Sequence, residues 1–240
     1  MKKTVLSLRK WALLPALLFA FFSCKKDDLD HSPVIEEDVQ VSGFTRVNAG
    51  AELNVIITKG AAFAIKARGE ANYVHDLEFS VADNTLEIQY QTYVQNRPQM
   101  DIYITLPTLT STILSGAATG TVAGFQGVPH VISAVLSGAS NLTMNGTGVN
   151  MNVEISGAST LTVTGATADL YGNISGGGKL KAYGLTATEV DISASGGATA
   201  QVQPVDALFA SASGGSRIYY KGNPGVKNIE TSGGGQVIKE

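Results

Sequence analysis

A short motif, serine followed by glycine and then alanine or glycine, recurs seven times between Ser115 and Gly234. Its serines are Ser115, Ser137, Ser156, Ser175, Ser195, Ser213 and Ser232, with spacings of 22, 19, 19, 20, 18 and 19 residues. A period of this length is typical of repeat proteins, in which one copy cannot bury its own apolar side and must stack on its neighbours. The repeat therefore predicts a solenoid.

The residues around the motif repeat with it. When the copies are aligned on their serine, the positions one and three before it and five and seven after it are mostly apolar. The position four after the serine is polar in every copy: Thr119, Asn141, Thr160, Lys179, Thr199, Arg217 and Gln236. This alternation on both sides of a glycine corner predicts two short strands per copy. A second turn is expected nine residues after the serine, at Gly124, Gly146, Gly165, Gly184, Pro204 and Gly222.

These patterns predict an all-β fold, a right-handed parallel β-helix of about seven coils of roughly 19 residues over residues 107–240. Stacked coils lie about 4.8 Å apart, so the body is about 30 Å long. The corner glycine can adopt the positive φ of a sharp bend, and the corner serine is expected to hydrogen-bond neighbouring backbone or the serine of the next coil. A phosphate loop needs a following helix and a nucleophilic serine needs a nearby histidine, so the motif is interpreted as structural.

Residues 41–106 lack the motif but show the alternation of strands at 63–67, 77–81, 86–90 and 102–106. Asp83-Asn84, between the second and third of these segments, predicts a hairpin turn. We expect this region to be an N-terminal β segment that caps the first coil, because an uncapped solenoid end exposes strand edges and apolar core.

The first 23 residues have the pattern of a lipoprotein signal peptide. Basic residues precede the apolar run 11–22, whose 12 residues are too few to span a bilayer. Cys24, the single cysteine, follows directly and resembles the acylated cysteine of bacterial lipoproteins. Ser23 fits the small residue before the cleavage point, whereas Phe21 and Phe22 depart from the usual pattern.

The segment after Cys24 is polar and acidic, and residues 24–40 are predicted to form a flexible tether. Lys26, Asp27 and Asp28 resemble the surface-export signal of some outer-membrane lipoproteins; the alternative is a solvated charge cluster. The expected location is the outer membrane, with a lipid anchor, on its periplasmic or cell-surface face.

The net charge of the chain restricts the classes of partner that it can bind. Removal of the signal leaves 13 basic against 20 acidic residues, a net charge of −7, which disfavours a nucleic-acid partner. No Lys or Arg occurs between Arg97 and Lys179. The expected partners are the membrane, through the anchor, and a glycan or envelope protein; no cofactor is expected.

Some parallel β-helices are polysaccharide lyases or hydrolases, which use acidic calcium sites or paired carboxylates. Glu154 and Glu230 share a column but lie four coils apart, about 19 Å. Asp169, Glu189 and Asp191 are the best metal candidates and are interpreted as solvated surface acids. No catalytic residue and no metal ligand is therefore predicted.

Aromatic residues supply the candidate binding positions. Tyr171 and Phe209 share the outward column four before the serine, while Tyr183 and Tyr219 occupy other outward positions. Exposed aromatic rings can stack on sugars, although single exposed aromatics are also common on protein surfaces.

The segments Phe44-Thr45-Arg46-Val47, Leu53-Asn54-Val55-Ile56-Ile57 and Leu86-Glu87-Ile88, followed by serial Ser-Gly-Ala/Gly coils, resemble the putative auto-transporter adhesin family with a head GIN domain. The resemblance covers about residues 41–240 and implies a bacterial envelope protein of β-helical fold. The favoured hypothesis is a non-catalytic binding, adhesion or structural module that presents a Thr/Ser/Asn-rich β-face to glycan or protein. The alternative is a polysaccharide lyase or hydrolase of the β-helix type.

Overall fold

The computed structural model describes residues 32–94, 97–146 and 148–240. The predicted signal peptide, the predicted lipidation site Cys24 and the predicted export signal at Lys26, Asp27 and Asp28 lie outside these residues. Within them, no helix is long and apolar enough to cross a membrane.

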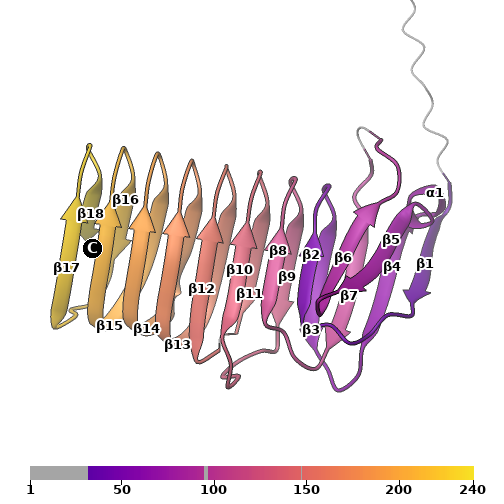
Figure 1. Ribbon diagram of the computed structural model, residues 1–240, viewed down its shortest axis with the longest axis horizontal. Helices are drawn as coiled ribbons and strands as arrows, with labels where there is room; N and C mark the ends of the chain where they lie inside the picture. Colours follow the sequence, from indigo (N-terminus) through magenta and orange to yellow (C-terminus); the bar gives the residue numbers. More distant parts are fainter. Residues whose placement is uncertain (1–31, 95–96, 147) are drawn as a thin grey trace, which may run out of the picture. The chain divides into compact units, whose positions relative to one another are not determined.

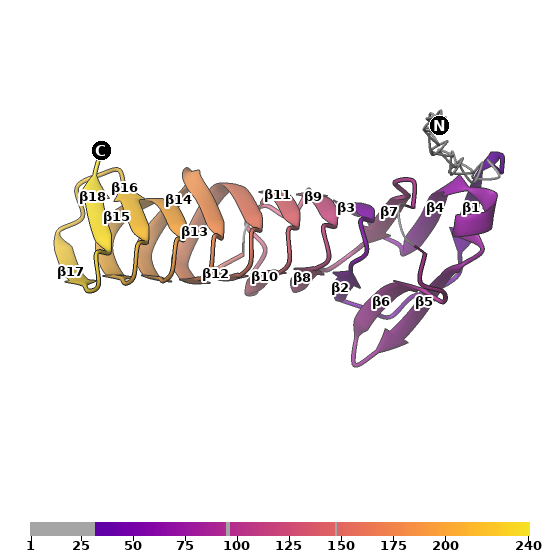
Figure 2. The same cartoon turned by 90° about the horizontal axis from the view of Figure 1, so that it is seen from above.

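The described chain forms one wound sheet of 18 strands whose two flat sides enclose the core (Figures 1 and 2). The pre-corner side contains the strands that lead into each corner: β6 (Thr85–Tyr90), β2 (Arg46–Ala49), β8 (Ser111–Leu114), β10 (Ile132–Leu136), β12 (Asn150–Ile155), the later parts of β13 (Thr160–Ile174), β14 (Lys179–Ala194) and β15 (Thr199–Ala212), and β17 (Val226–Thr231). The post-corner side contains β7 (Asp101–Leu106), β3 (Asn54–Lys59), β9 (Thr119–Ala123), β11 (Asn141–Asn145), the first parts of β13, β14 and β15, β16 (Arg217–Tyr220) and β18 (Gln236–Lys239). The predicted parallel β-helix is confirmed.

The strand register is the one that the aligned repeats predict. Ile155 pairs with Ile174, and Ile174 with Ala194, in parallel strands of neighbouring coils. On the post-corner side Leu142 pairs with Leu161, which pairs with Leu180. These side chains are buried and belong to a single core. Stacking thus buries the apolar columns that one coil could not cover alone.

Each corner depends on its first glycine. Gly138, Gly157, Gly176, Gly196 and Gly214 have φ between +65° and +72°, a region that side chains with a Cβ rarely adopt. The corners also stack by backbone hydrogen bonds: the amide of Ala158 donates to the carbonyl of Gly138 over 2.8 Å. Glycine is therefore required both by the bend and by the close approach of the next coil.

The serine that hydrogen-bonds inside the corner is not the serine of the motif, as was predicted, but a later one. The serine of the motif makes a side-chain bond only weakly, as at Ser156, whose Oγ donates to the carbonyl of Leu136 over 3.4 Å. The fully buried serines lie three positions later. Ser140 Oγ donates to Ser159 Oγ over 3.3 Å, and Ser216 Oγ donates to the carbonyl of Ala194 over 2.9 Å. These buried serines form hydrogen bonds with polar groups inside the turn, whereas the serine of the motif faces outward.

The region predicted to be only a cap contributes a coil of its own. Strands β2 and β3 lie between the β6/β7 pair and the β8/β9 pair, hydrogen-bonded in parallel to both. Their corner is Gly50-Ala51-Glu52, with φ of +52° at Ala51 and +63° at Glu52. The Ser-Gly repeat did not predict this coil, because the corner of the coil lacks the motif.

The remaining N-terminal strands do form a cap. The predicted hairpin at Asp83-Asn84 is confirmed: both residues have positive φ, and β5 (Leu77–Ala82) runs antiparallel to β6. On the other side β4 (Ala64–Glu70) pairs antiparallel with β7, and the short helix α1 (Ala71–Val74) follows it. Figure 2 shows the two sides diverging here, so that each is extended by antiparallel strands.

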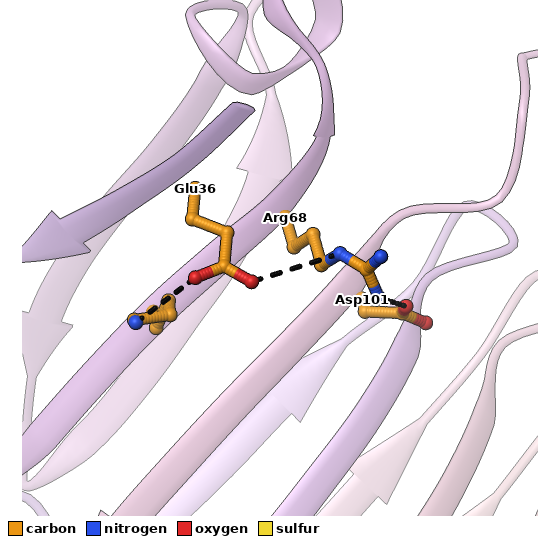
Figure 3. A network of polar contacts seen from close by, with 4 residues as sticks. Glu36, Arg68 and Asp101 are labelled. Carbon is orange, nitrogen blue, oxygen red and sulfur yellow. Dashed lines mark hydrogen bonds and ion pairs between the residues drawn. The ribbon is translucent and has the colours of Figure 1, made fainter. Parts of the chain in front are cut away.

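Part of the predicted tether is a strand. Residues 34–39 form β1 (Val34–Val39), which pairs antiparallel with β4 along its whole length. Ile35 and Val39 pack against the core, and Glu36 forms ion pairs with Lys66 and Arg68 at 3.1 Å and 3.7 Å (Figure 3). The tether prediction was wrong for these residues because Ile35 and Val39 bury apolar surface against the core and Glu36 meets basic partners on β4.

The opposite end of the solenoid ends on an open coil. Every residue of β17 is exposed, and within the described chain no strand pairs with its outer edge. Lys227 and Lys239 occupy the inward columns there, paired with Leu208 and Tyr220 of the preceding coil. Inward charges at a strand edge oppose further stacking.

Candidate binding surfaces

The outer face of the post-corner side carries an uncharged polar array over β9, β11 and β13. It consists of eight hydroxyl and amide side chains in three stacked columns: Thr119, Thr121, Asn141, Thr143, Asn145, Thr160, Thr162 and Thr164. Their alternation with buried residues turns every one of them outward. We call these residues the threonine array; its hydroxyl and amide groups can both donate and accept hydrogen bonds.

A network of charged residues borders the array on the N-terminal side. Asp101 accepts a hydrogen bond from Asn54 Nδ2 at 2.8 Å, and Thr119 Oγ1 donates to Asn54 Oδ1 over 3.0 Å. Arg68 lies 3.9 Å from Asp101 and links this chain of contacts to Glu36 on β1 (Figure 3). Satisfied contacts between neighbouring strands hold this edge of the array in place.

Basic and aromatic residues border the array on the C-terminal side. Lys179 and Lys181 lie on β14, and Arg217 and Tyr219 on β16, all on the outer face. Beside them, Lys221 Nζ lies 4.3 Å from the ring centroid of Tyr183, whose hydroxyl donates to Glu240 over 2.8 Å. Burial, together with this carboxylate, raises the pKa of Tyr183.

The four aromatic residues singled out in the sequence fall on opposite sides of the solenoid. Tyr171 and Phe209 lie on the pre-corner side, with Asp191 on the strand between them. Tyr183 and Tyr219 lie on the post-corner side. The structure therefore brings them together as two pairs, and a single stacking surface of all four is excluded. Whether either pair binds a ligand stays a prediction.

Carboxylates gather beside Tyr171. Asp169 pairs with Glu189 on the adjacent strand, and Asp191 follows two residues later. The negative charge of Asp169, with smaller contributions from burial and the other two carboxylates, raises the pKa of Tyr171. Among the described residues, no group of three or more His, Cys, Asp or Glu side chains has the arrangement of a metal site. Glu154 and Glu230 are separated by three intervening strands, as their shared column predicted.

A hollow with a volume of about 760 Å³ lies where the chain leaves β6. Its lining includes the carboxylates of Glu52 and Glu87 and the rings of Tyr90 and Tyr93. Asn48 Nδ2 donates to Glu87 over 2.6 Å, which fixes that carboxylate. Sequence reasoning missed this hollow because the loop after β6 carries no repeat; the only signal was its interruption of the strand pattern.

Arg97 anchors that loop. Its guanidinium lies 3.6 Å from the centroid of the Tyr90 ring and 2.6 Å from Asp76, and the arginine side chain is 6% exposed. Burial would raise the pKa of Asp76, but hydrogen bonds from Thr92 and Arg97 and the arginine charge outweigh it and lower that pKa. Burial raises the pKa of Tyr90 to about 12. Arg97 is thus committed to structure rather than free for a ligand.

Comparison with known proteins agrees with the fold. A family model described as "putative auto-transporter adhesin, head GIN domain" matches residues 43–224, and the chain belongs to this family. No protein of curated function matches the sequence. The family description is that of a binding protein rather than a catalyst.

Three solved structures share the fold. A putative adhesin from Bacteroides fragilis is 23% identical with a TM-score of 0.80; the match covers 87% of this chain and 97% of that one. A putative adhesin from Parabacteroides distasonis is 17% identical with a TM-score of 0.66, covering 87% and 98%. A putative lipid binding protein from the same organism is 16% identical with a TM-score of 0.68, covering 86% and 96%. At these identities the likeness concerns the fold.

Proposed function

We propose that this protein is a non-catalytic adhesion module of the cell envelope, anchored through a lipid on Cys24, that binds glycan through its post-corner side. The observation that carries the proposal is the threonine array, in which eight outward polar side chains repeat with the spacing of the strands. A regular face of hydroxyl and amide groups suits a partner that is itself a repeating polymer of hydroxyl groups.

Family membership supports the binding role, since the family is described as adhesins. The proposed location is the outer membrane, with the surface face favoured by Lys26, Asp27 and Asp28 after the cysteine.

The test is a glycan array and an envelope-protein pull-down with the mature chain carrying Cys24→Ala, which keeps the protein soluble. Thr143→Glu/Thr162→Glu places two bulky negative charges in the array and should abolish binding. Asn152→Glu/Asn173→Glu adds the same charges to the exposed pre-corner side and should leave binding intact. Equal binding by both double variants, or no ligand at all, would refute the proposal.

An enzyme of the lyase or hydrolase type remains the second candidate because of one observation, the hollow that contains Glu52 and Glu87. Carboxylate pairs carry out glycoside hydrolysis. Turnover of any polysaccharide that is lost in both Glu52→Gln and Glu87→Gln would establish this function in place of adhesion. Binding without turnover, unchanged in both variants, supports adhesion.

A further inference from the structure

The outward charges of the last coils are sorted by side. On the flat face of the pre-corner side they are acidic: Asp169, Glu189, Asp191 and Glu230. On the post-corner side they are basic: Lys179, Lys181, Arg217 and Lys221. Glu240 is the one carboxylate described on the latter face of these coils, and it accepts the hydrogen bond of Tyr183.

Three of these cations have no charged partner among the residues that the structure describes. The ion pairs of the described chain all involve residues 36–101, and none includes Lys179, Lys181 or Arg217. Lys179 and Arg217 lie two strands apart across Thr199, which corresponds to about 9.6 Å, and Lys181 lies about 7 Å along the strand from Lys179. Like charges at these spacings repel one another, so an anion bound among them is favoured.

The groups between the cations suit a sugar rather than a bare ion. Gln201 separates Lys181 from Tyr219 in one column, and Thr199 separates Lys179 from Arg217 in the next. Hydroxyl, amide and aromatic groups are thus interleaved with positive charges on one face. A lipid surface would call for exposed apolar side chains to insert, and the large exposed apolar residues of the described chain do not lie on the outer face of β14 and β16.

From this arrangement we infer that Lys179, Lys181, Arg217 and Tyr219 bind an anionic polysaccharide, a polymer whose sugars carry carboxylates. The inference rests on the proposed function and names the class of glycan. The polymer runs along the solenoid axis, with carboxylates at the lysines and the arginine and a sugar ring against Tyr219. The threonine array continues the same face toward the N-terminus and contacts the neighbouring sugars.

The net charge of −7 expected for the mature chain does not prevent this binding. The acidic side lies on the far side of the core, about 10 Å away, and the screening length at 0.1 M salt is about 10 Å. The polymer therefore experiences mainly the near, basic face. Because the contacts are exposed charges, the affinity is expected to fall as salt rises.

The experiment measures binding of the mature Cys24→Ala chain to polygalacturonate and to its fully methyl-esterified form, which has the same backbone without the charge. We expect binding to the first and at least tenfold weaker binding to the second. Lys179→Gln/Lys181→Gln should weaken polygalacturonate binding about tenfold. The matched control Arg46→Gln/Lys227→Gln removes two exposed charges from the pre-corner side and should change binding less than twofold.

The aromatic contact has its own pair of variants. Tyr219→Ala should weaken binding, whereas Tyr171→Ala on the acidic side should not. Equal losses in the two double variants that remove charges would show that net charge alone matters and would overturn the inference, as would preference for phosphatidylglycerol vesicles over polygalacturonate. Neutral glycans bound through the threonine array without polygalacturonate would overturn the inference and leave the proposed function standing.

Discussion

The corner glycines allow a quantitative test of the stacking geometry. At Gly157, where φ is +66°, an added Cβ would lie 2.4 Å from the carbonyl oxygen and 3.1 Å from the amide nitrogen of Gly138 in the preceding coil. Both atoms are backbone, and the carbonyl oxygen accepts the corner hydrogen bond from the amide of Ala158, so they cannot move aside independently. Gly157→Ala therefore combines an unfavourable φ with a collision.

The two effects can be given magnitudes. A left-handed conformation costs a residue with a Cβ about 1–2 kcal/mol. Overpacking against a rigid neighbour costs about 1–3 kcal/mol. We expect Gly157→Ala to lower the free energy of unfolding by about 2–5 kcal/mol, a large part of the stability of a typical domain.

Gly177→Ala is the matched control. Its φ is not positive, and an added Cβ would meet only the carbonyl oxygen of Gly157 at 3.5 Å, an ordinary contact. The equivalent corners already carry Ala139 and Ala158 at this position. The change should alter stability by less than about 0.5 kcal/mol.

The assay is urea unfolding followed by far-UV circular dichroism, together with hydrogen exchange of the Ala158 amide, which bonds across the corner. Gly157→Ala should shift the midpoint strongly and expose that amide to exchange. A loss of stability no greater than that of Gly177→Ala would refute the corner geometry as the determinant of stacking.

Three further predictions concern other parts of the molecule. Asp76→Asn should destabilise the protein by about 3 kcal/mol at pH 7, because it leaves Arg97 buried without its charged partner. Since the pKa of Asp76 is lowered in the folded state, the stability difference between wild type and variant should persist above about pH 4, where the unfolded group titrates, and shrink as the pH falls further. Urea unfolding across this pH range measures the difference. Lys227→Leu/Lys239→Val should restore the apolar columns of the last coil and cause end-to-end association detectable by light scattering, and a monomer at all concentrations would contradict the assigned role of these lysines. Cys24→Ala should abolish incorporation of labelled palmitate in cells, and undiminished labelling would refute the lipid anchor.

The repeat made most of the fold predictable. Because the coils stack in register, aligning sequence copies on the motif serine reproduced the spatial neighbours, such as Ile155 beside Ile174. The strands of the cap and the Asp83-Asn84 hairpin were also predictable, since alternation and turn residues are local signals.

Two parts of the fold were not predicted from the sequence, for physical reasons. The coil of β2 and β3 was hidden because Ala51 and Glu52 adopt the corner conformation without the motif, and because its stacking partners come later in the chain. The acidic strand β1 depends on Lys66 and Arg68, which are distant in sequence. Long-range pairing of this kind leaves no signal in a single segment.

The sequence predicted part of the proposed binding surface. The polar column after each corner was recognised, and it forms the edge of the threonine array. The positions of the aromatic residues predict their division into two pairs, since Tyr171 precedes the corner of its coil and Tyr219 follows the corner of its coil. The hollow at Glu52 and Glu87 required the three-dimensional path of the loop after β6.

The central claim, that the post-corner side is the binding surface, is tested most directly by hydroxyl-radical footprinting of the mature chain with and without polygalacturonate. We expect protection of Tyr219 and Lys181, with Tyr171 and Phe209 labelled equally in both states. Protection of Tyr171 and Phe209, or of Tyr93 in the hollow, with Tyr219 unprotected would contradict the claim.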